Sequence, residues 1–145
     1  MFANKEFYLQ LSSHPQNIRL VEPYVLKVKR RFDINDEIYF NILLVLTEAV
    51  NNCILHGNQA DPRKHVHIRM HPHRNALYFV VRDEGEGFNP ERLPDPTQPD
   101  RLTCTNGRGV FLMRELSDSV QYSNDGRQVE ISFQLHPLET NEIKN

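Results

Sequence analysis

Apolar residues recur along this chain with two different periods. Between residues 35 and 57 they return every three or four positions, the spacing of one face of an α-helix. These apolar positions form a wide stripe: Ile38, Ile42, Val45, Leu46, Ala49 and Cys53. Asn35 or Asp36 can cap the start of the helix, and Gly57 can end it. The segment is therefore predicted to be a long, largely buried helix.

Strict alternation, the period of a β-strand, marks other parts of the chain. Val66, Ile68 and Met70 alternate with polar residues and are predicted to point inward. The segments predicted to be strands are residues 6–13, 64–70, 76–82, 119–123 and 128–135. Turns at residues 71–75 and 124–127 would join the last four strands into two antiparallel hairpins.

Two further helices and one long loop complete the pattern. Residues 15–32 have apolar side chains at helical spacing, with Pro23 as a predicted kink, and residues 107–117 form a third helix. Residues 88–106 are polar and rich in proline, with no period. A loop of this length is typical of a functional lid rather than a simple connection. Residues 136–145 are expected to be a frayed tail.

Length and charge limit the class of protein. With 145 residues, the chain is expected to be a single domain over residues 1–145. Its 17 Lys and Arg against 19 Asp and Glu give a net charge of −2, which favours neither direct nucleic-acid binding nor an anionic membrane. No apolar run approaches the roughly 20 residues of a membrane span. Cys53 and Cys104 form no CxxC pair, so a cytoplasmic location is expected.

Glu48 and Asn52 are the first residues that could carry chemistry. They lie four positions apart, and so on one face of the long helix, among apolar neighbours. A carboxylate beside a neutral amide oxygen suits a general base next to a Mg²⁺ ligand. An exposed polar pair on a solvated face is the alternative interpretation, and it is favoured while this motif stands alone.

The sequence RDEGEGFNP, residues 82–90, sets acids among two glycines. Asp83 directly follows a predicted strand, and Gly85 and Gly87 stand two apart. A phosphate site needs N–H groups and cations, but carboxylates only accept hydrogen bonds. The loop therefore suits a ligand group that donates them, such as the amino group of adenine. Taken alone, a tight turn made soluble by acids would be the favoured interpretation.

The sequence TNGRGVFLM, residues 105–113, has the opposite electrostatics. Gly107 and Gly109 are predicted to precede a helix, and the residues around them are donors rather than acids: Thr105, Asn106 and Arg108. Helix N-terminal N–H groups together with a cation are what phosphates need. A flexible helix cap is the simpler interpretation. Together, however, the two glycine segments could hold the two ends of one nucleotide.

Histidines at positions 65, 67, 71 and 73 have a spacing that resembles a metal site. Pro72 and a predicted turn separate the two pairs, and exposed strand ends account for them. A zinc site is therefore not favoured.

The three motifs follow one another in a recognisable order. Glu-x-x-x-Asn on a helix, Asp-x-Gly-x-Gly after a strand and Gly-x-Gly before a helix resemble the N box and two glycine boxes of one ATPase superfamily. That superfamily, called GHKL or histidine kinase-like, includes gyrase, certain chaperones, histidine kinases and mismatch-repair proteins. LTEAVNNCILHGN and GRGVFLM are most similar to its small anti-sigma factor branch, the bacterial serine-protein kinases. The resemblance covers residues 6–135.

The resemblance implies a fold and a set of roles. The fold would be an α/β two-layer sandwich of the Bergerat type, with a mixed, mostly antiparallel sheet and helices on one face. Glu48 would be the general base, and Asn52 would contact the nucleotide through Mg²⁺. Asp83 would accept the adenine amino group, with Gly85 and Gly87 shaping that pocket. The phosphates of ATP would be held by Thr105, Asn106, Gly107, Arg108, Gly109 and Val110, under a lid at residues 89–106.

The resemblance also implies partners. Such proteins bind a sigma factor and phosphorylate a serine on an anti-anti-sigma protein, its antagonist, which frees or traps the sigma factor. Arg19 is the nearest match to an Arg that contacts the sigma factor in that family, and residues 15–32 carry a basic run. Contacts with nucleic acid or membrane are not implied, and a homodimer is left open.

Two departures leave alternatives open. Many members have an Arg just before the second glycine box, where this chain has Thr103, Cys104 and Thr105. A hydroxyl residue often follows the glycine of the last hairpin, where this chain has Arg127 or Gln128. A nucleotide-dependent binding module with little turnover therefore remains an alternative to a kinase. The detached ATP domain of a two-component histidine kinase is disfavoured, because no dimerising pair of helices carrying a phospho-accepting histidine precedes residue 35.

Overall fold

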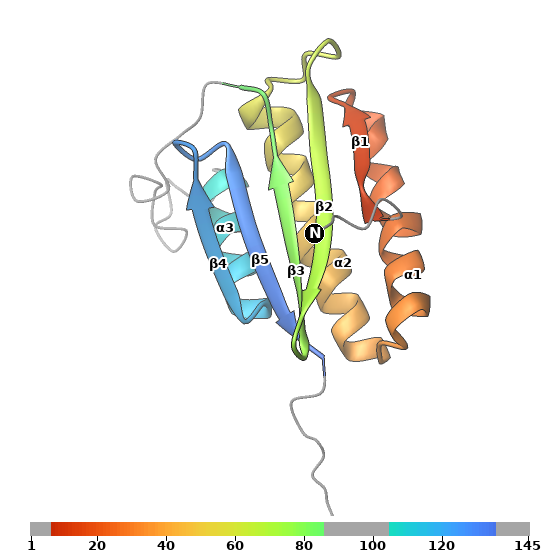
Figure 1. The fold of residues 1–145 in the computed structure, drawn as a ribbon. Coiled ribbons are helices and arrows are strands. Elements are labelled where there is room, and N and C mark those ends of the chain that lie inside the picture. Colours follow the sequence, from red (N-terminus) through yellow and green to blue (C-terminus); the bar gives the residue numbers. More distant parts are fainter. Residues whose placement is uncertain (1–6, 86–104, 136–145) are drawn as a thin grey trace, which may run out of the picture.

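A sheet with helices on one face forms the molecule, shown as a computed structural model in Figure 1. Residues 7–85 and 105–135 are described. The helices and strands run in this order: β1 (Leu9–Ser12), η2 (Pro15–Leu20), α1 (Val21–Phe32), α2 (Asp36–Asn52), η3 (Cys53–Gly57), β2 (His65–His73), β3 (Ala76–Arg82), α3 (Thr105–Leu116), β4 (Ser119–Ser123) and β5 (Gln128–Gln134). The sheet order is β1-β2-β3-β5-β4 with every described pairing antiparallel, so the predicted α/β sandwich is confirmed.

Alternation along the strands separates the two faces of this sheet. On β2, Val66, Ile68 and Met70 are buried toward the helices, as predicted. The predicted turn at residues 71–75 is wrong, because β2 continues through His73 and only Arg74 and Asn75 connect it to β3. Arg74 has a positive φ of 57°, which permits such a tight reversal. The four histidines consequently lie on one strand without a turn between them.

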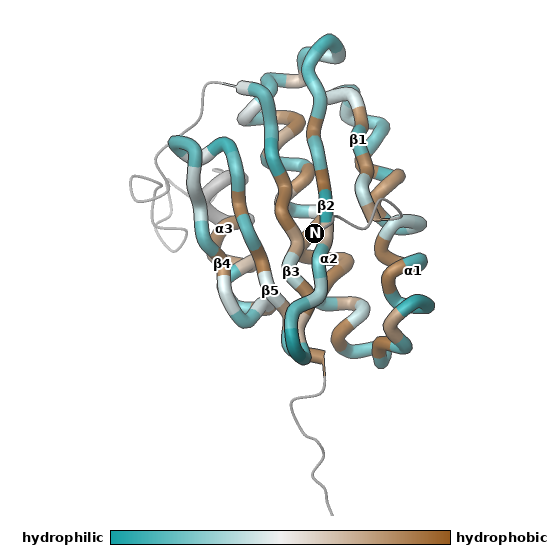
Figure 2. Tube along the Cα trace, in the orientation of Figure 1, coloured by the Kyte–Doolittle hydropathy of each residue, from teal (hydrophilic) through white to brown (hydrophobic). Residues whose placement is uncertain are grey.

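Helix α2 is the apolar centre of the helical layer. The Asn35 side chain caps it by accepting a hydrogen bond from the Ile38 N–H at 2.9 Å. Five of the six predicted stripe residues are buried, and Ile38 is partly buried. Contrary to the expectation from the sequence, residues 36–57 are long and apolar enough to span a membrane by length and composition alone, but half of their most apolar 18-residue window is buried inside the fold. Figure 2 shows hydrophobic residues along this helix and along the central strands that it covers.

The bounds of the first two predicted helices differ from those in the structure. Regular α-helix stops at Asn52, and a single π-helical turn carries the chain to Gly57. Residues 15–32 are not one helix but a 3₁₀ segment followed by α1. Pro23 lies in the first turn of α1, where its missing N–H leaves no hydrogen bond unmade, so it does not kink the helix. The predicted tail, residues 136–145, and most of the predicted lid lie outside the described residues.

Candidate functional site

Asp83 forms the most enclosed part of the site. It directly follows β3, and only 4% of its surface is exposed. One carboxylate oxygen accepts a hydrogen bond from the Gly85 N–H at 2.8 Å, and the thiol of Cys53 donates another. Burial raises the pKa of Asp83, while these hydrogen bonds and the charge of Arg127 oppose that rise. Asp83 is therefore a desolvated acceptor fixed by its neighbours.

Gly57 and Gly85 make this close packing feasible. A Cβ placed on Gly57 would collide with the carboxyl of Asp83, and one placed on Gly85 would collide with the backbone carbonyl of Gly57. The π-helical turn after α2 thus lies directly against the loop after β3. Sequence reasoning assigned Gly85 to the pocket but gave Gly57 only the end of a helix. No local signal reveals that residues 28 positions apart would touch.

The side chain of Asn58 also fixes the loop after β3 by hydrogen bonds. Its amide nitrogen donates to the Ser13 hydroxyl at 2.7 Å and to the His65 carbonyl at 3.0 Å. Its amide oxygen accepts from the Glu84 N–H at 2.8 Å. One buried side chain therefore links the residue after β1, the first residue of β2 and the segment after Asp83. Sequence reasoning missed this residue, because the three groups that it joins are distant along the chain.

Glu48 and Asn52 form the second part of the site. They lie one turn apart on α2, and Gly109 of α3 lies against both of them. A Cβ on Gly109 would be 2.7 Å from Glu48 Oε1 and 3.1 Å from Asn52 Nδ2. Asn52 is 9% exposed, and its buried Oδ1 accepts no hydrogen bond from any described residue. A buried amide oxygen left in this way usually has a ligand, an ion or water as its partner.

The second glycine segment differs from its prediction. Helix α3 begins at Thr105, so Gly107 and Gly109 lie inside the helix rather than before it. Thr105 and Asn106, predicted to end the lid, belong to the same helix. Gly109 needs its lack of a side chain for the approach to α2 rather than for a turn. Val110, expected among the phosphate contacts, is 5% exposed and packs in the core.

The remaining predicted residues are placed only in part. Thr105, Asn106 and Arg108 lie in α3, but the structure describes their backbone and not their side chains. Gly87, and with it residues 89–104 of the predicted lid, lies outside the described residues. Arg19 is exposed in the 3₁₀ segment Pro15–Leu20. Lys29, from the basic run that follows, pairs with Asp36 at 3.4 Å, so part of that run serves the fold.

One pocket connects the two parts of the site. It is open to solvent on one side and encloses about 290 Å³ of space, solvent included. The residues that line it are Ala49, Asn52, Cys53, Val81, Asp83, Met113, Tyr122, Gly126, Arg127 and Val129. Apolar walls with a carboxylate and an amide at separate positions suit a flat, partly polar ring. No group of three or more metal-ligating side chains (His, Cys, Asp or Glu) occurs in the described part of the chain.

Of the two residues that the sequence left as alternatives on the last hairpin, Arg127 is the one that lines this pocket. The sequence left Arg127 and Gln128 as alternatives for the position usually held by a hydroxyl. Gln128 pairs with Arg82 on β3, and the alternation of β5 turns it to the face opposite Val129. Arg127 lies in the pocket wall, and its Nη1 donates to the Gly85 carbonyl at 3.4 Å.

Comparisons with known proteins agree with this geometry. Residues 11–133 match the family of histidine kinase-like ATPase domains. An anti-sigma F factor of Anoxybacillus flavithermus is 31% identical over 133 residues, which cover 87% of this chain and 90% of that protein. An anti-sigma F factor of Geobacillus stearothermophilus is 30% identical, covering 79% and 80%. The serine-protein kinase RsbW of Bacillus subtilis is 23% identical, covering 80% and 76%.

Proposed function

The chain belongs to the family of histidine kinase-like ATPase domains, and from that premise we propose that it is an ATP-dependent anti-sigma factor kinase. It would bind a sigma factor and phosphorylate a serine on the antagonist of that sigma factor. The relatives named above support both activities, since some are named anti-sigma F factors and another a serine-protein kinase. The cytoplasm, where transcription takes place in bacteria, would be its site of action.

The observation that carries the kinase proposal is the arrangement of Glu48, Asn52 and Gly109. A carboxylate, a buried amide oxygen and a helical glycine meet beside a pocket whose other part is the acid Asp83. ATP has a matching polarity, with an amino-bearing base at one end and phosphates at the other. The base would lie against Asp83, and the phosphates would lie near the N-terminal turns of α3, whose N–H groups favour anions.

The residues present suit a bound Mg²⁺ ion. Asn52 Oδ1 is an oxygen without a partner among the described residues, and Mg²⁺ prefers oxygen ligands. Mg²⁺ held there would neutralise charge on the phosphates, which is its usual contribution to phosphoryl transfer. Glu48 is one helical turn away and would accept the proton of the attacking serine hydroxyl. The serine oxygen would then form a bond to the γ-phosphorus. The bond between the γ-phosphorus and the β,γ-bridging oxygen would break, and ADP would leave.

Transfer of labelled phosphate from ATP to the purified antagonist tests this proposal. Glu48→Ala should still bind ATP, while transfer should fall by roughly 10²–10⁴-fold, the usual contribution of a positioned base. Glu37→Ala, an exposed acid in the first turn of the same helix, is the matched control and should transfer at the parent rate. Transfer by Glu48→Ala at the parent rate would show that Glu48 is not the base.

A binding module with little turnover is the second candidate. Arg127 in place of a hydroxyl at the pocket favours it, together with Thr103, Cys104 and Thr105 in place of an expected Arg. This candidate predicts that the parent protein binds ATP and the sigma factor but transfers nothing to any antagonist. The same labelled-ATP assay therefore separates the two candidates.

Arg19 is proposed as a contact to the sigma factor. It is exposed and lies apart from the pocket, in the segment before α1. Arg19→Ala should weaken capture of the sigma factor without changing ATP affinity. Arg63→Ala, an exposed cation that pairs locally with Asp61 at 3.0 Å, is the control. Unchanged capture by Arg19→Ala would place the sigma-binding surface elsewhere, and a homodimer could be checked in the same preparations by light scattering.

A further inference from the structure

Arg127 lies beside Asp83 on the side of the sheet that faces the pocket. The Asp83 N–H donates to the Arg127 carbonyl at 2.9 Å, which continues the ladder between β3 and β5 past Arg82 and Gln128. Val81 pairs with Val129, and both are buried toward the helices. Asp83 comes two residues after Val81, and Arg127 comes two residues before Val129. Both therefore lie on the same face of the sheet as that buried pair. Directly opposed residues of an antiparallel pair have Cβ atoms about 5 Å apart, so the two side chains are neighbours.

The guanidinium of Arg127 keeps donors available at the mouth of the pocket. It has five N–H groups. Within the described residues, Nη1 donates to the Gly85 carbonyl at 3.4 Å and Nε to the Asn124 carbonyl at 3.2 Å. The nearest carboxylate oxygen of Asp125 is 3.8 Å from Nη2, which is longer than a hydrogen bond. The side chain is 39% exposed, so a ligand in the pocket could reach it.

Asp83 and Arg127 together present an acceptor next to a donor. The edge of adenine presents the complement, because its amino group donates and the neighbouring ring nitrogen N1 accepts. We propose that Arg127 is a base-reading residue of this protein, which donates a hydrogen bond to N1 of adenine while Asp83 accepts one from the amino group. This inference rests on the proposed binding of ATP. Guanine in the same orientation would present a carbonyl to Asp83 and an N–H to Arg127, so both contacts would be lost.

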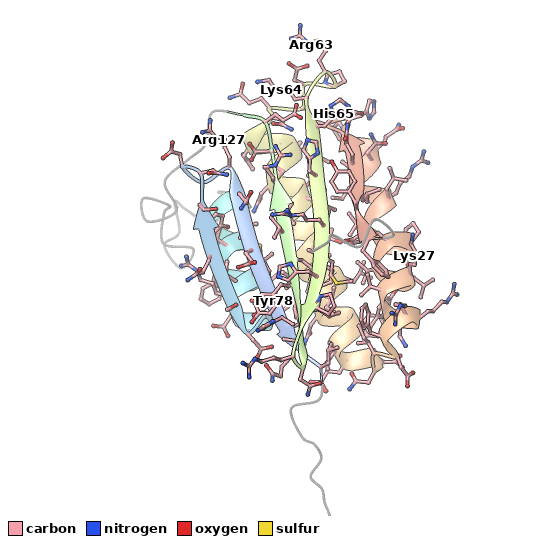
Figure 3. All side chains as sticks on the ribbon, viewed as in Figure 1. Lys27, Arg63, Lys64, His65, Tyr78 and Arg127 are labelled. Atoms are coloured by element: carbon pink, nitrogen blue, oxygen red, sulfur yellow. The ribbon has the colours of Figure 1, made fainter. Side chains whose placement is uncertain are left out.

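A role for Arg127 at the phosphates fits the structure less well. Its described contacts are to Gly85, which binds the Asp83 carboxylate, and to residues 124 and 125 of its own hairpin turn. The phosphates of ATP are proposed to lie near Glu48 and Gly109, which belong to α2 and α3. Figure 3 shows Arg127 at the end of the sheet that also carries Lys64 and His65, whereas Tyr78 lies toward the other end.

Calorimetric titration with ATP and with 1-deazaATP, in which a C–H replaces N1, tests this assignment. The parent should bind ATP about 10-fold more tightly than 1-deazaATP, as expected for one hydrogen bond from a charged donor. Arg127→Ala should bind ATP about 10-fold more weakly than the parent and should no longer distinguish the two nucleotides. Arg127→Met, which keeps most of the apolar stem, should behave in the same way. Arg69→Ala, an exposed arginine on the opposite face of the sheet, should match the parent.

The outcomes separate this inference from the function on which it rests. If Arg127→Ala weakens ATP and 1-deazaATP equally, Arg127 acts through stacking, charge or the phosphates, and the assignment to N1 is wrong. Unchanged ATP affinity in both Arg127 variants would also overturn it. If the parent binds neither nucleotide, the proposed ATP site itself fails. Melting curves of the nucleotide-free variants show whether each is folded before it is titrated.

Discussion

The two parts of the pocket are built in opposite ways. Around Asp83, backbone atoms are in contact and the carboxylate already accepts hydrogen bonds from Gly85 and Cys53. Around Asn52, only side-chain ends meet Gly109, and a buried oxygen has no partner among the described residues. The part around Asp83, proposed to hold the base of ATP, is therefore organised before a ligand binds. The part around Asn52, proposed to lie near the phosphates, keeps a polar atom without a hydrogen bond from the described residues, which a bound ion would satisfy.

Adding a methyl group to each part should show the difference most strongly. The Cβ of Gly85→Ala would meet the backbone carbonyl of Gly57, which cannot move without shifting the π-helical turn Cys53–Gly57 or the loop after β3. We expect the free energy of unfolding to fall by about 3 kcal/mol, the upper range for overpacking, as measured by urea denaturation.

Gly109→Ala is the matched change in the part of the site around Asn52. Its Cβ would be 2.7 Å from the end of the Glu48 side chain, which can rotate away, and alanine favours a helix by about 1 kcal/mol over glycine. Its stability should therefore be unchanged or higher, although transfer of phosphate should fall because Glu48 is displaced. Equal destabilisation by the two substitutions would contradict the comparison.

Asp83→Asn should separate binding from stability. An amide cannot replace the charged acceptor of the adenine amino group, so affinity for ATP should fall by about 2 kcal/mol in calorimetry. GTP should bind the parent poorly, because it presents a carbonyl at that position. Equal binding of GTP and ATP by the parent would contradict the role of Asp83.

The same substitution should stabilise the nucleotide-free protein. The folded-state pKa of Asp83 is raised by burial, so its ionised form disfavours the fold as pH rises above the ordinary value of 3.8. Asp83→Asn removes that penalty, and its gain in melting temperature should be present at pH 7 and vanish below pH 3.8. A lower melting temperature at pH 7 would show that the hydrogen bonds of the carboxylate outweigh its burial.

Asn52→Ala should also be no less stable than the parent. It removes a buried oxygen without a described partner, and such a group costs about 1–3 kcal/mol. We expect the free energy of unfolding to rise by about 1 kcal/mol or less, because the side chain also leaves a small cavity. Addition of Mg²⁺ should tighten ATP binding in the parent and not in this variant. If Mg²⁺ tightens ATP binding in Asn52→Ala as much as in the parent, Asn52 is not the metal ligand.

The smallest effect is expected at Glu84, on the outer side of the Asp83 loop. Its carboxylate contacts His67 Nε2 at 2.8 Å, and this hydrogen bond is the main reason that the pKa of Glu84 is lowered. A lowered pKa stabilises the fold above the unfolded-state value, and the gain is lost as pH falls through the folded-state value. Glu84→Gln should therefore lower the melting temperature slightly at pH 7 and match the parent in strong acid. The Glu84 side chain is 36% exposed, so the effect belongs to the range of surface pairs, below about 1 kcal/mol.

Local periodicity determined most of the secondary structure. The stripe along α2 and the alternation of β2 follow from how often a helix or a strand returns to one face, and this is decided by neighbours in the sequence. The Asn35 cap is equally local. The order of the three motifs identified the family, and it predicted that Glu48, Asn52 and Asp83 hold one nucleotide. Asn52 and Asp83 line one pocket in the structure, and their roles in binding a nucleotide stay a prediction.

Contacts between distant segments were decided by the tertiary structure alone. Three features depend on segments that are distant in the sequence: the start of α3 at Thr105, the π-helical turn Cys53–Gly57 and the hydrogen bonds of the Asn58 side chain. The choice of Arg127 over Gln128 depends on the register between β3 and β5, since a shift by one residue reverses every side chain. A sequence contains the period of each strand but not its register against a strand about 50 residues away. For that reason the residue that faces Asp83 could be recognised only in the fold.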